Sequence, residues 1–133
     1  MNVISDIPVT DVPVKSRRIM VVEDEMMIAL LLEDMLTDLG HTVVGVAGRL
    51  DSAIELARLT DAELAILDVN LSGEASFPVA KVLTERGVPF MFATGYGVLG
   101  LEAPFQNTLT LKKPFELNDL SRALEKLQAA RTT

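Results

Sequence analysis

The chain has 133 residues, 49% hydrophobic and 23% charged, which is typical of one globular domain and excludes a globally disordered chain. Its net charge of −7 argues against non-specific binding to nucleic acid, which needs an excess of Lys and Arg. Cysteine is absent, which excludes disulfides and thiolate metal sites, and no apolar run reaches the roughly 20 residues that cross a bilayer. We therefore expect a cytoplasmic protein with no membrane segment and no nucleic-acid partner.

The first predicted strand and helix follow a short N-terminal tail. Residues 1–16 contain two prolines and two aspartates and lack the apolar core of a signal peptide, so we expect a flexible tail before a domain over 17–131. The apolar run at 17–22 predicts a buried strand. Helical periodicity over 26–39 then predicts a helix that stops at Gly40. The apolar stripe expected to face the core is Ile28, Leu32, Met35 and Leu39.

The middle of the chain continues this alternation. A second strand is predicted at 42–47, and a second helix follows with its apolar stripe over 50–57. The uninterrupted apolar run at 64–67, which ends in Asp68, predicts a third strand buried on both faces. Ser76 is expected to cap a third helix that contains a proline in its first turn and runs towards Gly87. A fourth strand is predicted at 88–93.

The last part of the chain is the least regular. Three glycines and a proline between Gly95 and Thr108 leave room only for a short or irregular fourth helix. A fifth strand at 109–111 and a last helix at 117–130 complete the pattern, and this helix is expected to bury Leu117, Leu120, Leu124 and Leu127. Strand and helix alternate with connections too long for hairpins, which predicts an α/β fold with a doubly wound, five-stranded parallel sheet. We expect no output domain.

Reactive side chains follow four of the predicted strands. These residues are Glu23, Asp24, Asp68, Thr94 and Lys113. The carboxyl ends of parallel strands meet at one edge of a sheet, so the side chains should converge there. Three carboxylates in close contact repel one another unless a cation neutralises them, and Mg²⁺ suits a small set of oxygen ligands. A hydroxyl and an ammonium group complete a site in which Asp68 could attack a phosphoryl group.

Four motifs in this order resemble those of response-regulator receiver domains. They are Val21–Glu25, Leu67–Asn70, Phe92–Tyr96 and Lys113–Phe115, and the resemblance extends over 17–130. The third motif, Phe-Ala-Thr-Gly-Tyr, is similar to that of stand-alone receivers known mainly from alphaproteobacteria. The resemblance implies a flavodoxin-like strand order of 2-1-3-4-5. It also implies a single-domain response regulator of a two-component system or phosphorelay.

The resemblance further implies a role for each site residue. Asp68 would accept a phosphoryl group from the phosphohistidine of a sensor histidine kinase or a histidine phosphotransfer protein. The implied Mg²⁺ ligands are Asp24, Asp68, the backbone carbonyl of Asn70 and, mainly through water, Glu23. Thr94 and Lys113 would bind phosphoryl oxygens, and Pro114 would follow a cis peptide bond. Such a protein catalyses only its own phosphorylation and dephosphorylation.

One position departs from the receiver pattern. Most receivers carry an aromatic residue three positions before the lysine, and Thr110 stands there in this chain. In most receivers, this aromatic residue moves together with the threonine of the site when the domain is phosphorylated. Thr110 cannot take that part, so we expect a different switch. Our hypothesis is that Thr94 acts with Tyr96, and that phosphorylation orders 95–108.

Several interpretations stay open from the sequence. Met26, Met27 and Leu30 lie off the main stripe of their helix; they either widen its core face or, with Pro114, form a docking surface for the phosphoryl donor. The chain could also be a receiver-like module whose Asp68 is silent. A hydrolase is disfavoured, because Asn70 stands where a general acid would be needed. His41 is interpreted as a loop residue, and we expect a monomer.

Overall fold

The computed structural model describes residues 15–95 and 101–131. Their elements are β1 (Arg18–Val22), α1 (Met26–Asp38), β2 (Thr42–Ala47), α2 (Leu50–Leu59), β3 (Leu64–Asp68), β4 (Asn70–Leu71), β5 (Glu74–Ala75), α3 (Phe77–Arg86), β6 (Phe90–Thr94), β7 (Thr110–Lys112) and α4 (Leu117–Arg131). No helix within these ranges is both long and apolar enough to span a membrane. The expected tail over 1–16 falls almost wholly outside the described residues.

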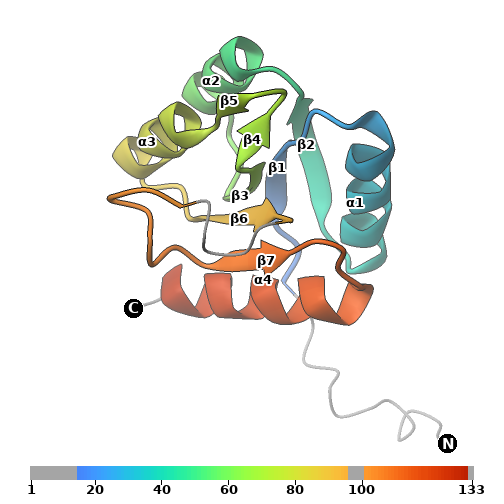
Figure 1. Ribbon diagram of the computed structural model, residues 1–133. Coiled ribbons are helices and arrows are strands. Elements are labelled where there is room, and N and C mark those ends of the chain that lie inside the picture. Colours follow the sequence, from blue (N-terminus) through green and yellow to red (C-terminus); the bar gives the residue numbers. More distant parts are fainter. Residues whose placement is uncertain (1–14, 96–100, 132–133) are drawn as a thin grey trace, which may run out of the picture.

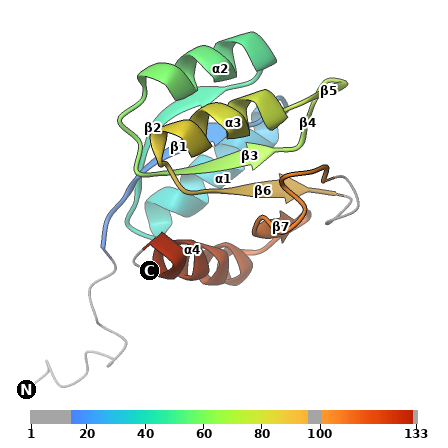
Figure 2. The same cartoon turned by 90° about the vertical axis from the view of Figure 1, so that its left-hand side faces the viewer.

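The main sheet has five strands in the order β2-β1-β3-β6-β7, and each neighbouring pair is parallel. With β6 and β7 counted as the fourth and fifth predicted strands, this is the expected order 2-1-3-4-5. Figures 1 and 2 show α2 and α3 over one face of the sheet and α1 and α4 over the other. The doubly wound α/β fold is therefore confirmed.

The central strand β3 divides its side chains between two cores, and all five of its residues are buried. Leu64 and Ile66 pack in the core formed with α1 and α4, whereas Ala65 and Leu67 pack in the core formed with α2 and α3. Successive strand residues point to opposite faces of a sheet, so a strand covered on both faces must be apolar throughout. This explains the uninterrupted apolar run that ends at Asp68.

The buried stripe of α1 differs from the prediction. Its buried residues are Ala29, Leu32 and Leu36, and Leu32 alone belongs to the predicted set. The other predicted residues, Ile28, Met35 and Leu39, are only partly buried. The buried face is shifted by one position from the predicted one, to Ala29 in place of Ile28 and to the fully buried Leu36 in place of Met35.

The last helix buries Leu120, Leu124 and Leu127 as predicted, but the prediction was wrong for Leu117, which is 37% exposed. Leu117 is the first residue of α4. Side chains of a helix lean towards its N-terminus, so that of Leu117 extends beyond the first turn, which leaves it exposed.

The capping of α3 also differs in part from the prediction. Ser76 precedes the helix and Pro78 lies in its first turn, but the Ser76 side chain makes no capping hydrogen bond. Its hydroxyl is buried and has no hydrogen-bond partner within the described residues. The backbone at Ser76 (φ −85°, ψ 8°) is not extended as it is at most capping residues, which explains why the hydroxyl does not cap the helix.

In the segment between β6 and β7, where a short or irregular helix was expected, the described residues 101–109 form turns. Within the described residues 101–109, the N–H of Phe105 donates to the Glu102 carbonyl over 2.7 Å, and the N–H of Thr108 donates to the Phe105 carbonyl over 3.1 Å. The Phe105 ring stacks on Phe77 at a centroid distance of 5.6 Å, which ties this turn-rich segment to α3. Tyr96, the expected switch residue, lies outside the described residues.

Candidate functional site

Three carboxylates meet at the carboxyl edge of the sheet, as the sequence predicts. Glu23 and Asp24 follow β1, Asp68 ends β3, and the two strands are neighbours in register, with Val22 opposite Leu67. One carboxylate oxygen from each acid lies within 4.8 Å of the others. Glu23 and Asp68 are only 4% and 9% exposed. Their negative charges are therefore held close together with little water to screen them.

Lys113 supplies the positive charge that this cluster needs. Its Nζ atom lies 2.6 Å from Oε1 of Glu23 and 3.2 Å from Oδ2 of Asp68. The lysine follows β7, and its N–H donates to the carbonyl of Thr94 at the end of β6, over 2.9 Å. The peptide bond between Lys113 and Pro114 is cis, as the resemblance implied.

Glu23 is engaged at both carboxylate oxygens by the protein itself. Oε1 accepts from Lys113, and Oε2 accepts from the N–H of Glu25 over 3.1 Å. Asp24 is the more open acid of the pair, and its Oδ2 accepts from the hydroxyl of Ser72 over 2.8 Å. Of these two acids, Asp24 is thus better placed for direct contact with a ligand.

The surroundings shift the pKa of three of these groups. Burial, followed by the charge of Glu23, raises the pKa of Asp68 to about 6, and the opposing charge of Lys113 limits the rise. Burial disfavours the charged form of Lys113, but its hydrogen bond to Glu23 and the charge of Asp68 outweigh this and raise its pKa. Burial likewise disfavours ionised Asp24, but its hydrogen bonds, led by that from Ser72, lower its pKa.

A small hairpin, β4–β5, covers one side of the cluster and was not predicted. Ser72 and Gly73 at its tip have φ values of 53° and 94°, the pattern of a two-residue type I′ turn. The N–H of Gly73 donates to Oδ1 of Asn70 over 2.7 Å, and the N–H of Asn70 donates to Oδ1 of Asp68 over 3.2 Å. The Ser-Gly dipeptide is a known turn signal and could have revealed the hairpin.

The side chains around the cluster form an open pocket of about 460 Å³. It is lined by Asp24, Glu25, Asp68, Asn70, Ser72, Gly95 and Lys113. Thr94 is buried at the end of β6, one residue before Gly95. The candidate metal ligands are carboxylate oxygens of Glu23, Asp24 and Asp68. Negatively charged oxygen ligands fit a hard divalent cation such as Mg²⁺. The pocket could hold this cation together with a phosphoryl group beside Asp68.

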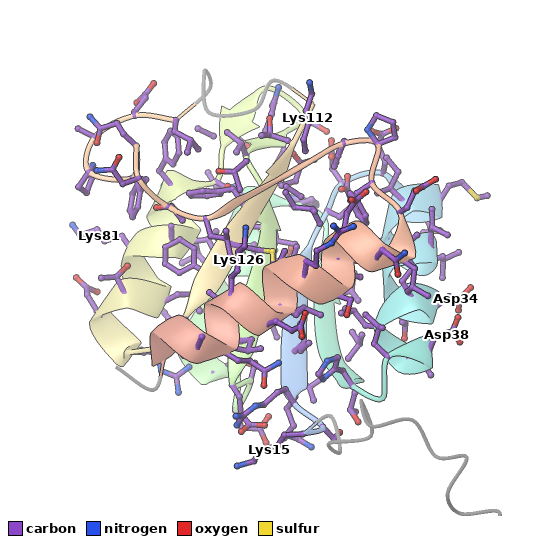
Figure 3. The ribbon with its side chains drawn as sticks, turned by 90° about the horizontal axis from the view of Figure 1, so that it is seen from below. Lys15, Asp34, Asp38, Lys81, Lys112 and Lys126 are labelled. Atoms are coloured by element: carbon purple, nitrogen blue, oxygen red, sulfur yellow. The ribbon has the colours of Figure 1, made fainter. Side chains whose placement is uncertain are left out.

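The predicted docking residues lie outside this pocket. Met26 and Met27, at the start of α1, are 75% and 78% exposed, and Leu30 is also exposed. The interpretation that they widen the core face is therefore wrong. Figure 3 shows Asp34 and Asp38 projecting outward farther along α1, so the helix surface is apolar near the pocket and acidic beyond it.

Comparisons with known proteins agree with this architecture. No family model matches the chain. The chain is 32% identical over 113 residues to the transcriptional regulatory protein PdtaR of Mycobacterium tuberculosis, covering 82% of this chain and 55% of PdtaR. The solution structure of SdrG from Sphingomonas melonis Fr1 is 39% identical and superposes with a TM-score of 0.76, over 85% of this chain and 97% of SdrG. The BeF3-activated conformation of SdrG from Pseudomonas melonis Fr1 is also 39% identical, with a TM-score of 0.72 over 83% and 94%.

The chain belongs to the receiver domains of response regulators, the signalling proteins of two-component systems. The match to SdrG covers nearly all of that chain, whereas the match to PdtaR covers about half of its length.

Proposed function

We propose that the protein is a single-domain response regulator that accepts a phosphoryl group on Asp68. The donor is the phosphohistidine of a sensor histidine kinase or a histidine phosphotransfer protein in the cytoplasm. The observation that carries this proposal is the convergence of Asp68 with Glu23, Asp24 and Lys113 in one pocket. The activated conformation of the relative SdrG with BeF3 supports it.

The proposed chemistry is an in-line transfer to the Asp68 carboxylate. An unprotonated Asp68 oxygen forms a bond to phosphorus while the bond from phosphorus to the donor imidazole nitrogen breaks. The bonding electron pair stays on that nitrogen, which then takes up a proton. Lys113, which lies 3.2 Å from Oδ2, would hold a phosphoryl oxygen and stabilise its charge. The chain would catalyse this transfer and the later hydrolysis on itself alone.

The residues present fit a bound Mg²⁺. Asp24, Asp68 and the backbone carbonyl of Asn70 would hold it, with Glu23 acting through water. When bound, the cation would neutralise charge on the acids and the phosphoryl oxygens. Thr94 would bind another phosphoryl oxygen and, with Tyr96, would report the modification. Thr110 cannot serve as the aromatic partner because it has no ring.

We further propose that the start of α1 docks the phosphoryl donor. The exposed side chains of Met26, Met27 and Leu30 lie just after the acids Glu23 and Asp24, and Pro114 lies just after Lys113. Flexible methionines adapt well to an apolar partner surface. A donor docked on this surface would bring its histidine near Asp68. The phosphorylated chain, a monomer, would then act through a protein partner or pass the phosphoryl group on.

Incubation with acetyl phosphate and MgCl₂, followed by intact mass measurement, tests the central claim. The expected result is one hydroxylamine-labile phosphoryl adduct on the natural chain and none on Asp68→Asn. Asp34→Asn, which changes an exposed aspartate of α1, should still form the adduct. If neither acetyl phosphate nor phosphoramidate modifies the natural chain, a silent interaction module becomes the better interpretation.

A further inference from the structure

The hydroxyl of Ser72 joins the hairpin tip to the acid cluster. It donates to Oδ2 of Asp24 over 2.8 Å, between residues that are 48 positions apart in the sequence. The start of the same hairpin is tied to Asp68, because the N–H of Asn70 donates to its Oδ1. The hairpin is therefore attached to two different acids of the site.

The hairpin turn is stabilised by a hydrogen bond of its own. Oδ1 of Asn70 accepts from the N–H of Gly73, so the amide side chain stabilises the turn while the hydroxyl of Ser72 reaches across to Asp24. Ser72 has φ 53°, a left-handed conformation that is strained for a residue with a Cβ atom. A glycine would adopt this conformation more easily but would have no hydroxyl to offer.

We propose that Ser72 is a positioning residue for the divalent cation of this site. Its hydroxyl orients the Asp24 carboxylate and, through the hairpin, sets the distance between that carboxylate and the Asn70 carbonyl. This inference rests on the proposed function, which assigns both groups as cation ligands.

The hydrogen bond and the cation can use Asp24 at the same time. Mg²⁺ needs only one oxygen of a carboxylate, and the hydrogen bond from the Ser72 hydroxyl uses Oδ2 of Asp24 alone. Hydrogen bonds that orient metal ligands typically change metal affinity by 10- to 100-fold. The loss of this hydroxyl should therefore weaken cation binding without removing any ligand.

Titration of the full chain with MgCl₂ by calorimetry and by amide NMR tests the inference. Ser72→Ala removes the hydroxyl and adds no backbone freedom, whereas Ser72→Gly removes it and relieves the positive φ. Both variants should bind Mg²⁺ about tenfold more weakly than the natural chain. Ser72→Asn, which tolerates the left-handed conformation and restores a donor, should regain part of the affinity.

A control and a structural readout separate this role from a general effect on the hairpin. Glu74→Gln changes an exposed residue of the hairpin and should bind Mg²⁺ like the natural chain. Without metal, amide exchange at Gly73 should be faster in Ser72→Ala than in Glu74→Gln. Equal or tighter Mg²⁺ binding by both Ser72→Ala and Ser72→Gly would overturn the inference and leave the proposed function intact. Absence of Mg²⁺ binding by the natural chain would overturn both.

Discussion

Lys113 is bonded more closely to Glu23 than to Asp68: its Nζ atom lies 2.6 Å from Oε1 of Glu23 and 3.2 Å from Oδ2 of Asp68. Short contacts between an ammonium group and a carboxylate are the stronger charge-assisted hydrogen bonds. Glu23 thus holds the lysine beside Asp68. A phosphoryl oxygen on Asp68 would have to share Lys113 with Glu23.

Removal of the lysine charge should destabilise the fold. In Lys113→Met, the two buried carboxylates of Glu23 and Asp68 lose their cation, and we expect the free energy of unfolding at pH 7 to fall by about 2 kcal/mol. Urea unfolding without divalent cations measures this. Lys112→Met, at an exposed neighbouring position, is the matched control and should change stability by less than about 0.5 kcal/mol. Equal stability of the two variants would contradict the role given to Lys113.

Removal of the Asp68 charge should instead stabilise the fold at high pH. Because its pKa is raised from 3.8 to about 6, the folded chain binds the proton more tightly than the unfolded chain, and this contribution to stability is lost as the pH rises through about 6. The stability advantage of Asp68→Asn over the natural chain should therefore be about 2 kcal/mol larger at pH 8 than at pH 4.

Thermal unfolding from pH 4 to pH 8 in EDTA measures this difference. Asp34→Asn, an exposed aspartate that projects from α1 in Figure 3, should show no such pH-dependent gain. Addition of Mg²⁺ should reduce the advantage of Asp68→Asn, since the cation stabilises the natural carboxylate cluster.

The sheet and the reactive cluster were predictable because both follow from local patterns. Apolar runs that alternate with helical stripes imply a parallel sheet, and a parallel sheet brings strand-end residues such as Asp24, Asp68 and Lys113 to one edge. The resemblance to receiver domains also predicted the cis peptide bond before Pro114, which the structure contains. These features need no knowledge of how distant side chains are oriented.

The remaining features depend on contacts that no local pattern specifies. The hydroxyl of Ser72 reaches Asp24 only because a two-residue turn places it over the pocket. Leu117 fits an apolar stripe but starts its helix, so it is exposed. Ala29 is buried although its small side chain gave no strong signal. In each case, tertiary packing decides what periodicity leaves open.

His41 lies in a loop but is buried, and its burial makes the stability of the fold depend on pH. Its Nδ1 accepts from the N–H of Arg17 over 3.1 Å, so the ring is neutral at that nitrogen. Burial and then the charge of Arg17 lower its pKa from the usual 6.5. The unfolded chain therefore binds the proton first, and stability is lost as the pH falls below 6.5 towards the folded-state pKa.

NMR titration of the folded chain should give a midpoint for His41 below 6.5. His41→Asn keeps an acceptor for Arg17 but cannot take up the proton. From pH 7.5 to pH 5.5, the natural chain should lose stability relative to this variant. A midpoint at or above 6.5 would show that the ring is not held in its neutral form.

The apolar start of α1 can be tested separately from the chemistry of Asp68. Met26 and Met27 are 75% and 78% exposed, so the double variant Met26→Gln/Met27→Gln should keep the stability of the natural chain. If this surface docks the phosphoryl donor, transfer from a phosphorylated histidine phosphotransfer protein should slow by at least about tenfold, as for loss of 1.4 kcal/mol of binding. Modification by acetyl phosphate, which needs no docking, should be unchanged.

Leu59→Gln is the matched control for this experiment, because Leu59 is 74% exposed at the end of α2, on the opposite face of the sheet. It should leave both reactions at the natural rate. An equally slowed transfer to the Leu59 variant would show that any exchange of an exposed apolar side chain for glutamine slows the reaction. Slower reaction of the double variant with acetyl phosphate would instead place Met26 and Met27 in the chemistry of the pocket, since both begin α1 directly after the three acids that follow β1.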